Sequence, residues 1–372
     1  MFVRSCLIVA VSFTVGGSFL QAAPKETVDP AAGFVQVHKE WKGLIARLKQ
    51  IQQRYRTDSN ADKKALTTEY DAKLEQAKAI EPKLAGLAEK AYVVSPNQDK
   101  DVDEYLFGYL GGLVSADKYE EAARLARILI DHDFQHKLFN YLAGMSFFAT
   151  NDFDDAQKYL KLADESKEID QNGKRYLASI DSYKVLWAKE QQIRAAEDKA
   201  DNLPQVKLTT SKGDIVVQLF ENEAPQATAN FISLVEKKFY DGLKFHRVLP
   251  GFMAQAGDPK GDGTGGPGYT IPDESDREDH RTHFRGSVSM AKTAEKNSGG
   301  SQFFLTFLPT STLDGKYTAF GRVIEGTDVL AKLQRIQPDE PGMADKIIKA
   351  TVLRKRSNHN YERQILKKSD KK

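Results

Sequence analysis

The sequence of 372 residues has a single cysteine, Cys6, and two tryptophans. One thiol cannot form a disulfide within the chain or build a thiolate metal site. Long hydrophobic runs are scarce: 28% of the residues are charged, and only one stretch, near the N-terminus, is apolar enough to consider as a membrane span. The sequence therefore excludes a polytopic membrane protein. An excess of one charge is lacking too, since 54 Lys and Arg face 52 Asp and Glu, which gives no general argument for nucleic acid as a partner.

The first 23 residues have the pattern of a secretory signal. Arg4 supplies a basic start, residues 6–20 are apolar, and Ala22 and Ala23 form a small-residue end. We therefore expect a periplasmic or secreted protein with no membrane span after cleavage, and with no remaining thiol. The alternative is an uncleaved N-terminal anchor, because Leu20 stands near the cleavage point where a small residue is preferred.

Residues 24–203 predict a helical domain. Between residues 33 and 200 only Pro82 and Pro96 interrupt a composition rich in helix-forming residues. An apolar stripe at steps of three and four predicts one long helix: Trp41, Leu44, Ile45, Leu48, Ile51 and Tyr55. A weaker stripe from Leu66 follows a polar break. Two long helices folded back on each other fit this pattern.

A repeat follows the two long helices. The segment Lys118–Ala122 is echoed by Asp152–Ala156, 34 residues later. Around the second copy, small and large packing residues resemble a tetratricopeptide repeat: Gly144, Phe147, Phe153, Ala156 and Ala163. Two interpretations stay open. The helices form a concave face for a peptide or protein partner, or they pack so as to position or dimerise the second domain. General holdase activity of this half is a further hypothesis.

The pattern changes at Asn202-Leu203-Pro204, where we place the domain boundary. Short strands with turn signals then predict a closed barrel or a sandwich. The eight expected strands are 206–210, 214–220, 243–249, 252–255, 287–291, 303–307, 317–324 and 349–354. Two helices are expected between them, one from Pro225 and one over about 328–334. A basic run, 356–372, ends the chain; such a tail is usually solvated, with anionic lipid or nucleic acid as the alternative.

Three blocks of this half carry a specific signature: residues 245–258 (Phe-His-Arg-Val-Leu-Pro-Gly-Phe-Met-Ala-Gln-Ala-Gly-Asp), residues 290–304, and residues 313–323. In this order and spacing they resemble the cyclophilins, the barrel-type peptidyl-prolyl cis-trans isomerases, over about 204–355. The resemblance implies an eight-stranded antiparallel β-barrel capped by two helices. It also implies an isomerase that acts on proline-containing polypeptides and uses no cofactor and no metal.

The residues suit this chemistry. Rotation about an Xaa–Pro bond meets a barrier of about 20 kcal/mol, because the nitrogen lone pair is delocalised into the carbonyl. A catalyst needs only to prefer the twisted amide, whose nitrogen can accept a hydrogen bond. The guanidinium of Arg247 is a suitable donor, since it is always charged.

The resemblance assigns the catalytic role to Arg247, with Gln255 holding both it and the substrate. It also assigns a set of substrate-binding residues: Phe252, Met253, Gln302, Phe304, Leu313, Tyr317, Ala291 and Gly263. Three features depart from the family pattern. Thr312 stands where many members carry Trp, and Tyr317 stands where they often carry His. The loop between Met290 and Gln302 is one residue longer than in the common eukaryotic form. Loss of the indole donor predicts weaker cyclosporin binding.

Other interpretations of the barrel half remain. His280 and His283 lie in a polar loop with acidic neighbours, where a metal site is an alternative without a recognised ligand pattern. The glycine-rich segment 261–268 predicts a turn beside the substrate groove, because it lacks the ending of a phosphate loop. For the whole chain we expect an isomerase that assists the folding of exported proteins. The alternative is a catalytically weak module that binds proline peptides on a helical scaffold.

Overall fold

The computed structural model describes residues 29–339, 342–357 and 359–367, so the predicted signal at 1–23 lies outside the described residues. The chain divides into two compact units, one that ends at Ala91 and one that begins at Tyr92. The boundary expected at 203/204 therefore falls inside the second unit. Across the described ranges, every helix is either too short or too polar to cross a membrane.

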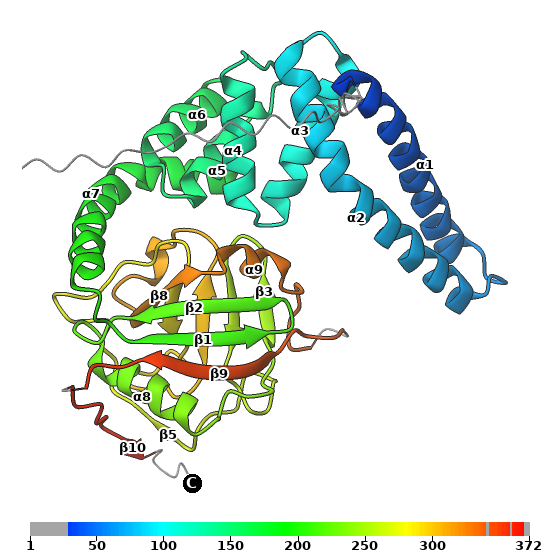
Figure 1. The fold of residues 1–372 in the computed structure, drawn as a ribbon. Helices are drawn as coiled ribbons and strands as arrows, with labels where there is room; N and C mark the ends of the chain where they lie inside the picture. The colour runs from blue at the N-terminus through cyan, green and yellow to red at the C-terminus, as the bar shows by residue number, and fades with distance from the viewer. Residues whose placement is uncertain (1–28, 340–341, 358, 368–372) are drawn as a thin grey trace, which may run out of the picture. The chain divides into compact units, whose positions relative to one another are not determined.

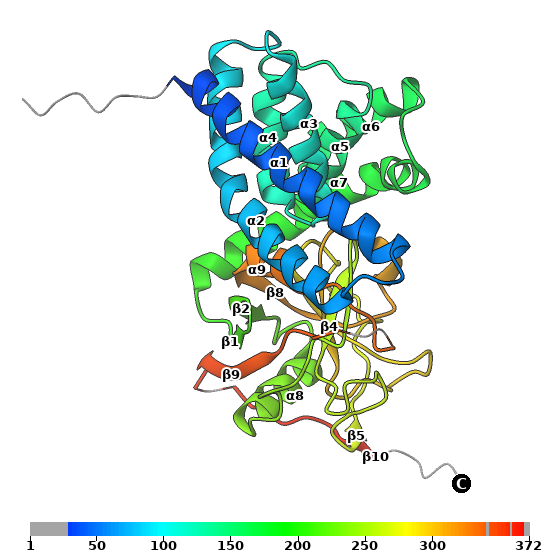
Figure 2. The same ribbon diagram turned by 90° about the vertical axis from the view of Figure 1, so that its right-hand side faces the viewer.

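The first unit is built on a helical hairpin. Helix α1 (Pro30–Thr57) begins where the Asp29 side chain accepts a hydrogen bond from the Ala31 amide, and α2 (Lys63–Val94) returns alongside it. Arg47 on α1 lies 2.6 Å from Glu69 on α2, and Gln52 donates to the Tyr70 hydroxyl at 3.0 Å. The two views of the ribbon show the antiparallel pair (Figures 1 and 2). The hairpin expected from the apolar stripes is confirmed.

The second unit opens with five helices, which we call the helical module. They are α3 (Lys100–Ser115), α4 (Tyr119–Ile130), α5 (Phe139–Ala149), α6 (Phe153–Glu165) and α7 (Gln171–Ala200). The turns α3–α4 and α5–α6 contain Asp117 at φ 60° and Asn151 at φ 63°, at the same position of the predicted repeat. Gly144 lets α5 approach α6, because an added Cβ would lie 2.7 Å from the Leu160 Cγ.

The rest of the second unit is an antiparallel barrel. Its strands are β1 (Gln205–Thr210), β2 (Gly213–Leu219), β3 (Arg247–Leu249), β4 (Met253–Ala256), β6 (Ser287–Met290), β7 (Phe303–Thr306), β8 (Ala319–Glu325) and β9 (Ile347–Arg354). They pair in the order β3-β4-β7-β6-β8-β2-β1-β9. The sheet closes beyond its edge strands, where the Ile347 amide donates to the Leu243 carbonyl and Val248 bonds to Ile336. The expected eight-stranded fold is confirmed.

Two helices cap the barrel: α8 (Pro225–Glu236) and the short α9 (Thr327–Lys332), which lie toward its opposite ends in Figure 1. Pro225 starts α8 as expected, and the backbone amides of Gln226 and Ala227 donate to the buried Glu274 carboxylate. The core consists of residues from both helices and the inward face of the strands, with fully buried Phe231, Phe303 and Phe320 at ring distances of 5.2 and 5.3 Å. This core orients the opposite, outward face of the same strands.

The described part of the C-terminal run lies against the barrel, which differs from the solvated tail expected. The Arg356 Nε lies 2.6 Å from the buried carboxylate of Glu221, and the Tyr361 hydroxyl donates to the same carboxylate at 2.7 Å. Further on, β10 (Leu366–Lys367) pairs with β5 (Tyr269–Thr270). The buried carboxylate of Glu221 thus holds the basic C-terminal segment against the barrel. Sequence composition could not reveal this contact.

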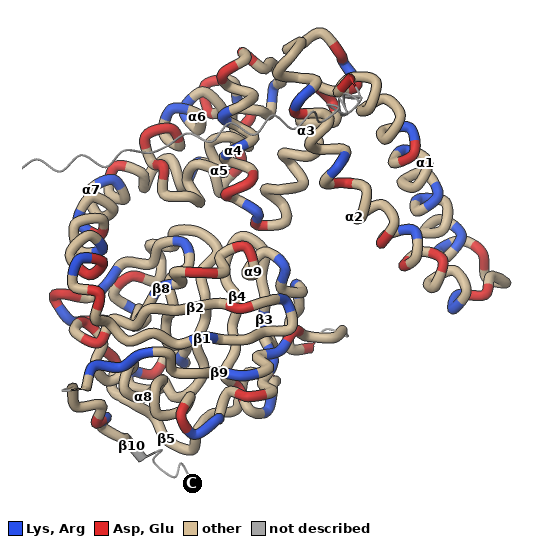
Figure 3. The backbone as a smooth tube through the Cα atoms, viewed as in Figure 1, with Lys and Arg blue, Asp and Glu red and all other residues tan. Residues whose placement is uncertain are grey.

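Contacts between α7 and the barrel are both ionic and aromatic. Figure 3 shows basic and acidic residues interspersed along α7. Of the acidic ones, Glu190 and Glu197 are buried against Arg281 of the barrel half. Phe284, which is fully buried, lies 4.8 Å from the Trp187 ring and 6.1 Å from the Tyr183 ring of α7. The helical module and the barrel therefore share one packed interface.

Candidate functional site

The outward face of β3, β4 and β7 brings the predicted site together. Arg247 is paired in register with Gln255, and Gln255 with Phe304. Cross-strand partners in an antiparallel sheet project to the same face. Their neighbours along the strands, Val248 and Ala254, belong to the core. The three side chains therefore form one row on the outside of the barrel, where Arg247 is half-buried.

An apolar floor adjoins this row. Met253 is two residues from Gln255 on the same strand face, and it is 2% exposed; Phe304 is 5% exposed although it points away from the core. Phe252 precedes β4 and is half-buried, as is Leu313 in the short helix η1 (Ser311–Leu313). Neither Phe252 nor Phe304 belongs to the barrel core, and both contribute to the covered outer face.

Two rings flank Phe304. The Tyr317 ring meets it edge-on, with centroids 5.8 Å apart, and the His283 ring stacks on it at 6.1 Å. Tyr317 lies just before β8, which starts at Ala319 rather than at the expected 317. The Tyr317 ring therefore stands beside the apolar floor as an aromatic wall, at a position where the family often carries His.

A network of amides fixes the polar edge. The Gln255 Nε2 donates to the Gln302 Oε1 at 2.8 Å, and the Gln302 Nε2 donates to the carbonyls of Gly263 and Gly265 at 3.0 and 2.9 Å. Gly263 has φ 89°, a conformation that favours glycine. Gln302 therefore ties strand β4 to the glycine-rich turn, while Gln255 stays beside Arg247 by register.

Ala291 closes the row on the far side. It follows β6, is half-buried, and its amide donates to the Gln302 carbonyl at 2.9 Å. The next residue, Lys292, lies 3.4 Å from Asp273 and 5.7 Å from the centroid of the Tyr317 ring. The long loop after Ala291 is thereby held against the wall of the site.

His283 is a site residue that sequence reasoning missed. Its ring is fully buried behind Phe304, with Nδ1 2.7 Å from the Asp314 Oδ1 and Nε2 3.0 Å from the Ser289 Oγ. Ser289 is also fully buried, so this serine is no accessible nucleophile. A buried aromatic histidine between two fixed polar partners orients Phe304. No pattern in the sequence connects these three residues.

The sequence left a metal site at His280 and His283 as an alternative, and the structure gives these two histidines separate partners. Within the described ranges, His, Cys, Asp and Glu form no group of three suited to a metal ion. His280 lies with its Nδ1 2.7 Å from the Arg277 carbonyl, and His283 is engaged behind Phe304. His280 therefore contacts the backbone of its own loop, whereas His283 contacts Asp314 and Ser289.

Comparisons with known proteins find peptidyl-prolyl cis-trans isomerases of the cyclophilin type. The family model for cyclophilin-type peptidyl-prolyl cis-trans isomerases matches residues 205–352. A peptidyl-prolyl cis-trans isomerase of Helicobacter pylori is 45% identical over 148 residues, which are 38% of this chain and 90% of that protein. One of Synechococcus elongatus is 45% identical over 146 residues, 39% of this chain and 97% of that protein. A solved cyclophilin-type isomerase of Cryptosporidium parvum is 31% identical, with a TM-score of 0.38, over 40% of this chain and 97% of that chain.

The matched residues define an isomerase of prolyl peptide bonds. The chain belongs to the cyclophilin-type peptidyl-prolyl cis-trans isomerase family, since a relative 45% identical to it is covered over 97% of its length. Cyclophilins bind proline-containing peptides. The family match covers residues 205–352 and does not include the helical half of the chain.

Proposed function

We propose that this isomerase acts by donating a hydrogen bond from Arg247 to the nitrogen of a twisted Xaa–Pro bond, without a covalent intermediate. The observation that carries the proposal is the row of Arg247, Gln255 and Phe304 on neighbouring strands. The proline ring would rest on the floor formed by Phe252, Met253 and Phe304. The guanidinium would then face the amide nitrogen from the edge of that floor.

The energetic demand on this arrangement is modest. A reduction of the barrier by about 7 kcal/mol gives an acceleration of about 10⁵-fold. Preorganised donors in a partly dry site contribute about 3–4 kcal/mol each. A charge-assisted hydrogen bond that forms only in the twisted state, together with an apolar floor that excludes water, can supply a large share.

The mechanism is tested with Arg247→Ala and Arg247→Lys on a proline tetrapeptide. We expect Arg247→Ala to lower kcat/KM by about 100-fold or more, as for loss of one transition-state donor. Lys keeps the charge but not the planar fork, so it should recover only part of the activity. Full activity of Arg247→Ala would refute the role of this residue. Wild-type protein that binds the peptide without accelerating isomerisation would instead favour the binding-module alternative.

We further propose that the substrates are exported polypeptides whose folding waits on slow prolyl isomerisation. The support is the signal-like pattern of residues 1–23. Cell fractionation with mass analysis of the mature N-terminus tests this. A mature chain outside the cytoplasm that starts near residue 24 supports the proposal, and a cytoplasmic chain that starts at Met1 contradicts it.

A further inference from the structure

The helical module reaches the catalytic hairpin through one buried residue. Asp117, in the turn between α3 and α4, is 1% exposed. Its Oδ1 accepts hydrogen bonds from the Gly251 amide at 2.7 Å and from the Tyr119 hydroxyl at 3.0 Å. Its Oδ2 pairs with the Arg335 guanidinium. The carboxylate therefore connects the helical module to two separate segments of the barrel half.

Both segments border β3, the short strand that begins with Arg247. Gly251 lies in the turn that joins β3 to β4, midway between Arg247 and Gln255. Ile336, the residue after Arg335, exchanges backbone hydrogen bonds of 2.8 and 3.1 Å with Val248 in the middle of β3. Asp117 thus reaches the end of β3 through the turn, and it reaches the outer edge of β3 through Arg335, which precedes Ile336.

Strand β3 contains only three residues at the edge of the sheet, paired with β4 on one side and bonded to Ile336 through Val248 on the other. The turn after it is held to the helical module through Gly251. Movement of its turn would shift Arg247 relative to Phe304, which is two strands away. A misplacement of about 1 Å costs roughly 100-fold in catalysis where orientation matters. The position of the guanidinium over the apolar floor therefore depends on what anchors the turn.

The partners of the Asp117 side chain are suited to a charged carboxylate. A buried carboxylate is costly unless it is paired and hydrogen-bonded, and Asp117 has both kinds of partner. Neighbouring contacts hold the α3–α4 turn in place: the Arg285 Nη2 donates to the Asp117 carbonyl at 3.2 Å, and the Arg335 Nη2 donates to the Ala116 carbonyl at 3.0 Å. Bonds to a charged acceptor are stronger than neutral ones, so the turn at Gly251 is held by a strong bond.

We propose that Asp117 is a positioning residue of the isomerase, through which the helical module fixes the β3–β4 hairpin and hence Arg247. This inference rests on the proposed function, because it assumes that the outer face of the hairpin carries the catalysis. It assigns the helical module a part in the active site itself. The module then is not only a docking platform for other proteins.

The test compares Asp117→Asn with Glu221→Gln in the full chain. Asn tolerates the positive φ at position 117, and the change removes the charge that Arg335 faces. Glu221 is a matched control, because it too is a buried carboxylate that contacts an arginine and a tyrosine hydroxyl, Arg356 and Tyr361; the His359 Nε2 lies 3.9 Å from it. Its contacts belong to the C-terminal segment rather than to the hairpin. Loss of stability should therefore be similar in the two variants.

Two measurements separate positioning from general stability. Isomerisation of a proline tetrapeptide is followed well below the unfolding temperature, and hydrogen exchange reports on the Gly251 amide. We expect Asp117→Asn to lower kcat about tenfold, which corresponds to about 1.4 kcal/mol, with KM within about twofold. Exchange at Gly251 should be faster. Glu221→Gln should leave kcat within about twofold.

The outcomes are distinguishable from failure of the proposed function. Faster exchange at Gly251 with unchanged kcat in Asp117→Asn would overturn the positioning role, while a loss in Arg247→Ala would leave the mechanism standing. Equal losses of kcat in Asp117→Asn and Glu221→Gln would also overturn it. If Asp117→Asn does not fold, Tyr119→Phe removes one donor to the same oxygen. A fall of about threefold in kcat then supports the role, and an unchanged kcat contradicts it.

Discussion

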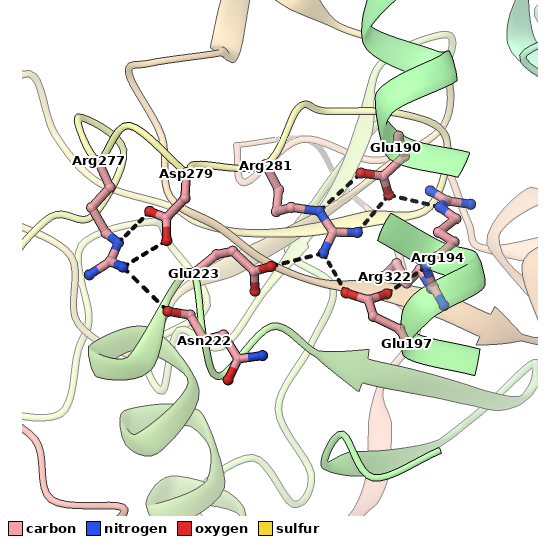
Figure 4. Close-up of polar contacts among 9 residues, drawn as sticks. All are labelled: Glu190, Arg194, Glu197, Asn222, Glu223, Arg277, Asp279, Arg281 and Arg322. Atoms are coloured by element: carbon pink, nitrogen blue, oxygen red, sulfur yellow. Dashed lines mark hydrogen bonds and ion pairs between the residues drawn. The ribbon is translucent and has the colours of Figure 1, made fainter. Parts of the chain in front are cut away.

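Replacement of Arg281 by Met tests how strongly the helical module and the barrel are joined. The Arg281 side chain is 2% exposed and binds Glu190 through two hydrogen bonds of 2.9 and 2.8 Å, and Glu197 through one of 2.5 Å (Figure 4). A third carboxylate, Glu223, lies 3.5 Å away. Methionine keeps an unbranched stem beside Phe220, whose ring centroid lies 3.8 Å from the guanidinium carbon. The substitution therefore removes mainly the charge.

The expected loss follows from the carboxylates left behind. Arg194 remains 2.7 Å from Glu190 and Arg322 remains 2.9 Å from Glu197, so each of these carboxylates keeps one partner. Removal of one member of a buried ionic cluster costs about 3–5 kcal/mol. At about 2–4 °C per kcal/mol for a domain of this size, we expect the melting temperature to fall by about 10 °C.

The loss should depend on pH with a definite sign. Burial raises the pKa of Glu190, but its hydrogen bonds and charge interaction with Arg281 outweigh burial and hold the pKa below its ordinary value of 4.5. Without Arg281, only Arg194 opposes the effect of burial, so the pKa of Glu190 is higher in the folded variant than in the folded wild type. Protonation of Glu190 therefore costs the variant less stability than it costs the wild type, so the deficit of the variant is largest near pH 7 and shrinks as the pH falls toward about 5 and below.

Thermal unfolding at both pH values gives the measurement, and Arg277→Met is the matched control. Arg277 pairs with Asp279 at 2.9 Å on the surface, where both side chains are 40% or more exposed (Figure 4). A pair of this kind contributes about 0–1 kcal/mol. If Arg281→Met loses no more stability than Arg277→Met, or if its deficit does not change with pH, the reasoning about the buried cluster is wrong.

Two further predictions concern stability. Burial lowers the pKa of His246 in the folded chain, so the unfolded chain binds more protons. The free energy of unfolding should therefore decrease as the pH drops through about 6.5. Between about pH 7.5 and 5.5, the denaturant midpoint should decrease less for His246→Gln than for the wild type. Gly144→Ala should lower the free energy of unfolding by about 1–2 kcal/mol, because the added Cβ would lie 2.7 Å from the Leu160 Cγ. The control Gly108→Ala, whose Cβ meets nothing within 4 Å, should instead stabilise helix α3 by about 0.5–1 kcal/mol. Thermal unfolding measures both changes.

The barrel was predictable because its evidence is local. Short runs bounded by turn signals located the eight strands of the barrel, and Pro225 marked the start of α8. Within these eight strands the errors lay at the ends, as with Leu243 to His246, which are bridged to the chain before β9 without forming regular strand. The short strands β5 and β10 were not predicted. The family resemblance then implied a barrel, where the strand pattern alone had left a barrel or a sandwich open.

The site was predictable only in part. The residues of the row on β3, β4 and β7 are close in the signature blocks, and the family resemblance named them. His283 and Asp117 carry no such signal. Asp117 lies 134 residues from Gly251, and its contact depends on how the helical module packs on the barrel.

The order of residues along the chain therefore determined the local elements and the barrel, and it named the residues of the proposed isomerase face, since these depend on short-range periodicity and on a dense motif. Packing between distant segments decided which charges are buried together, what lies behind Phe304, and which residue of the helical module meets the turn between β3 and β4. A carboxylate in a turn has the same local sequence signal whether water or a distant backbone amide satisfies it. Only the folded chain shows that Asp117 meets Gly251 and Arg335.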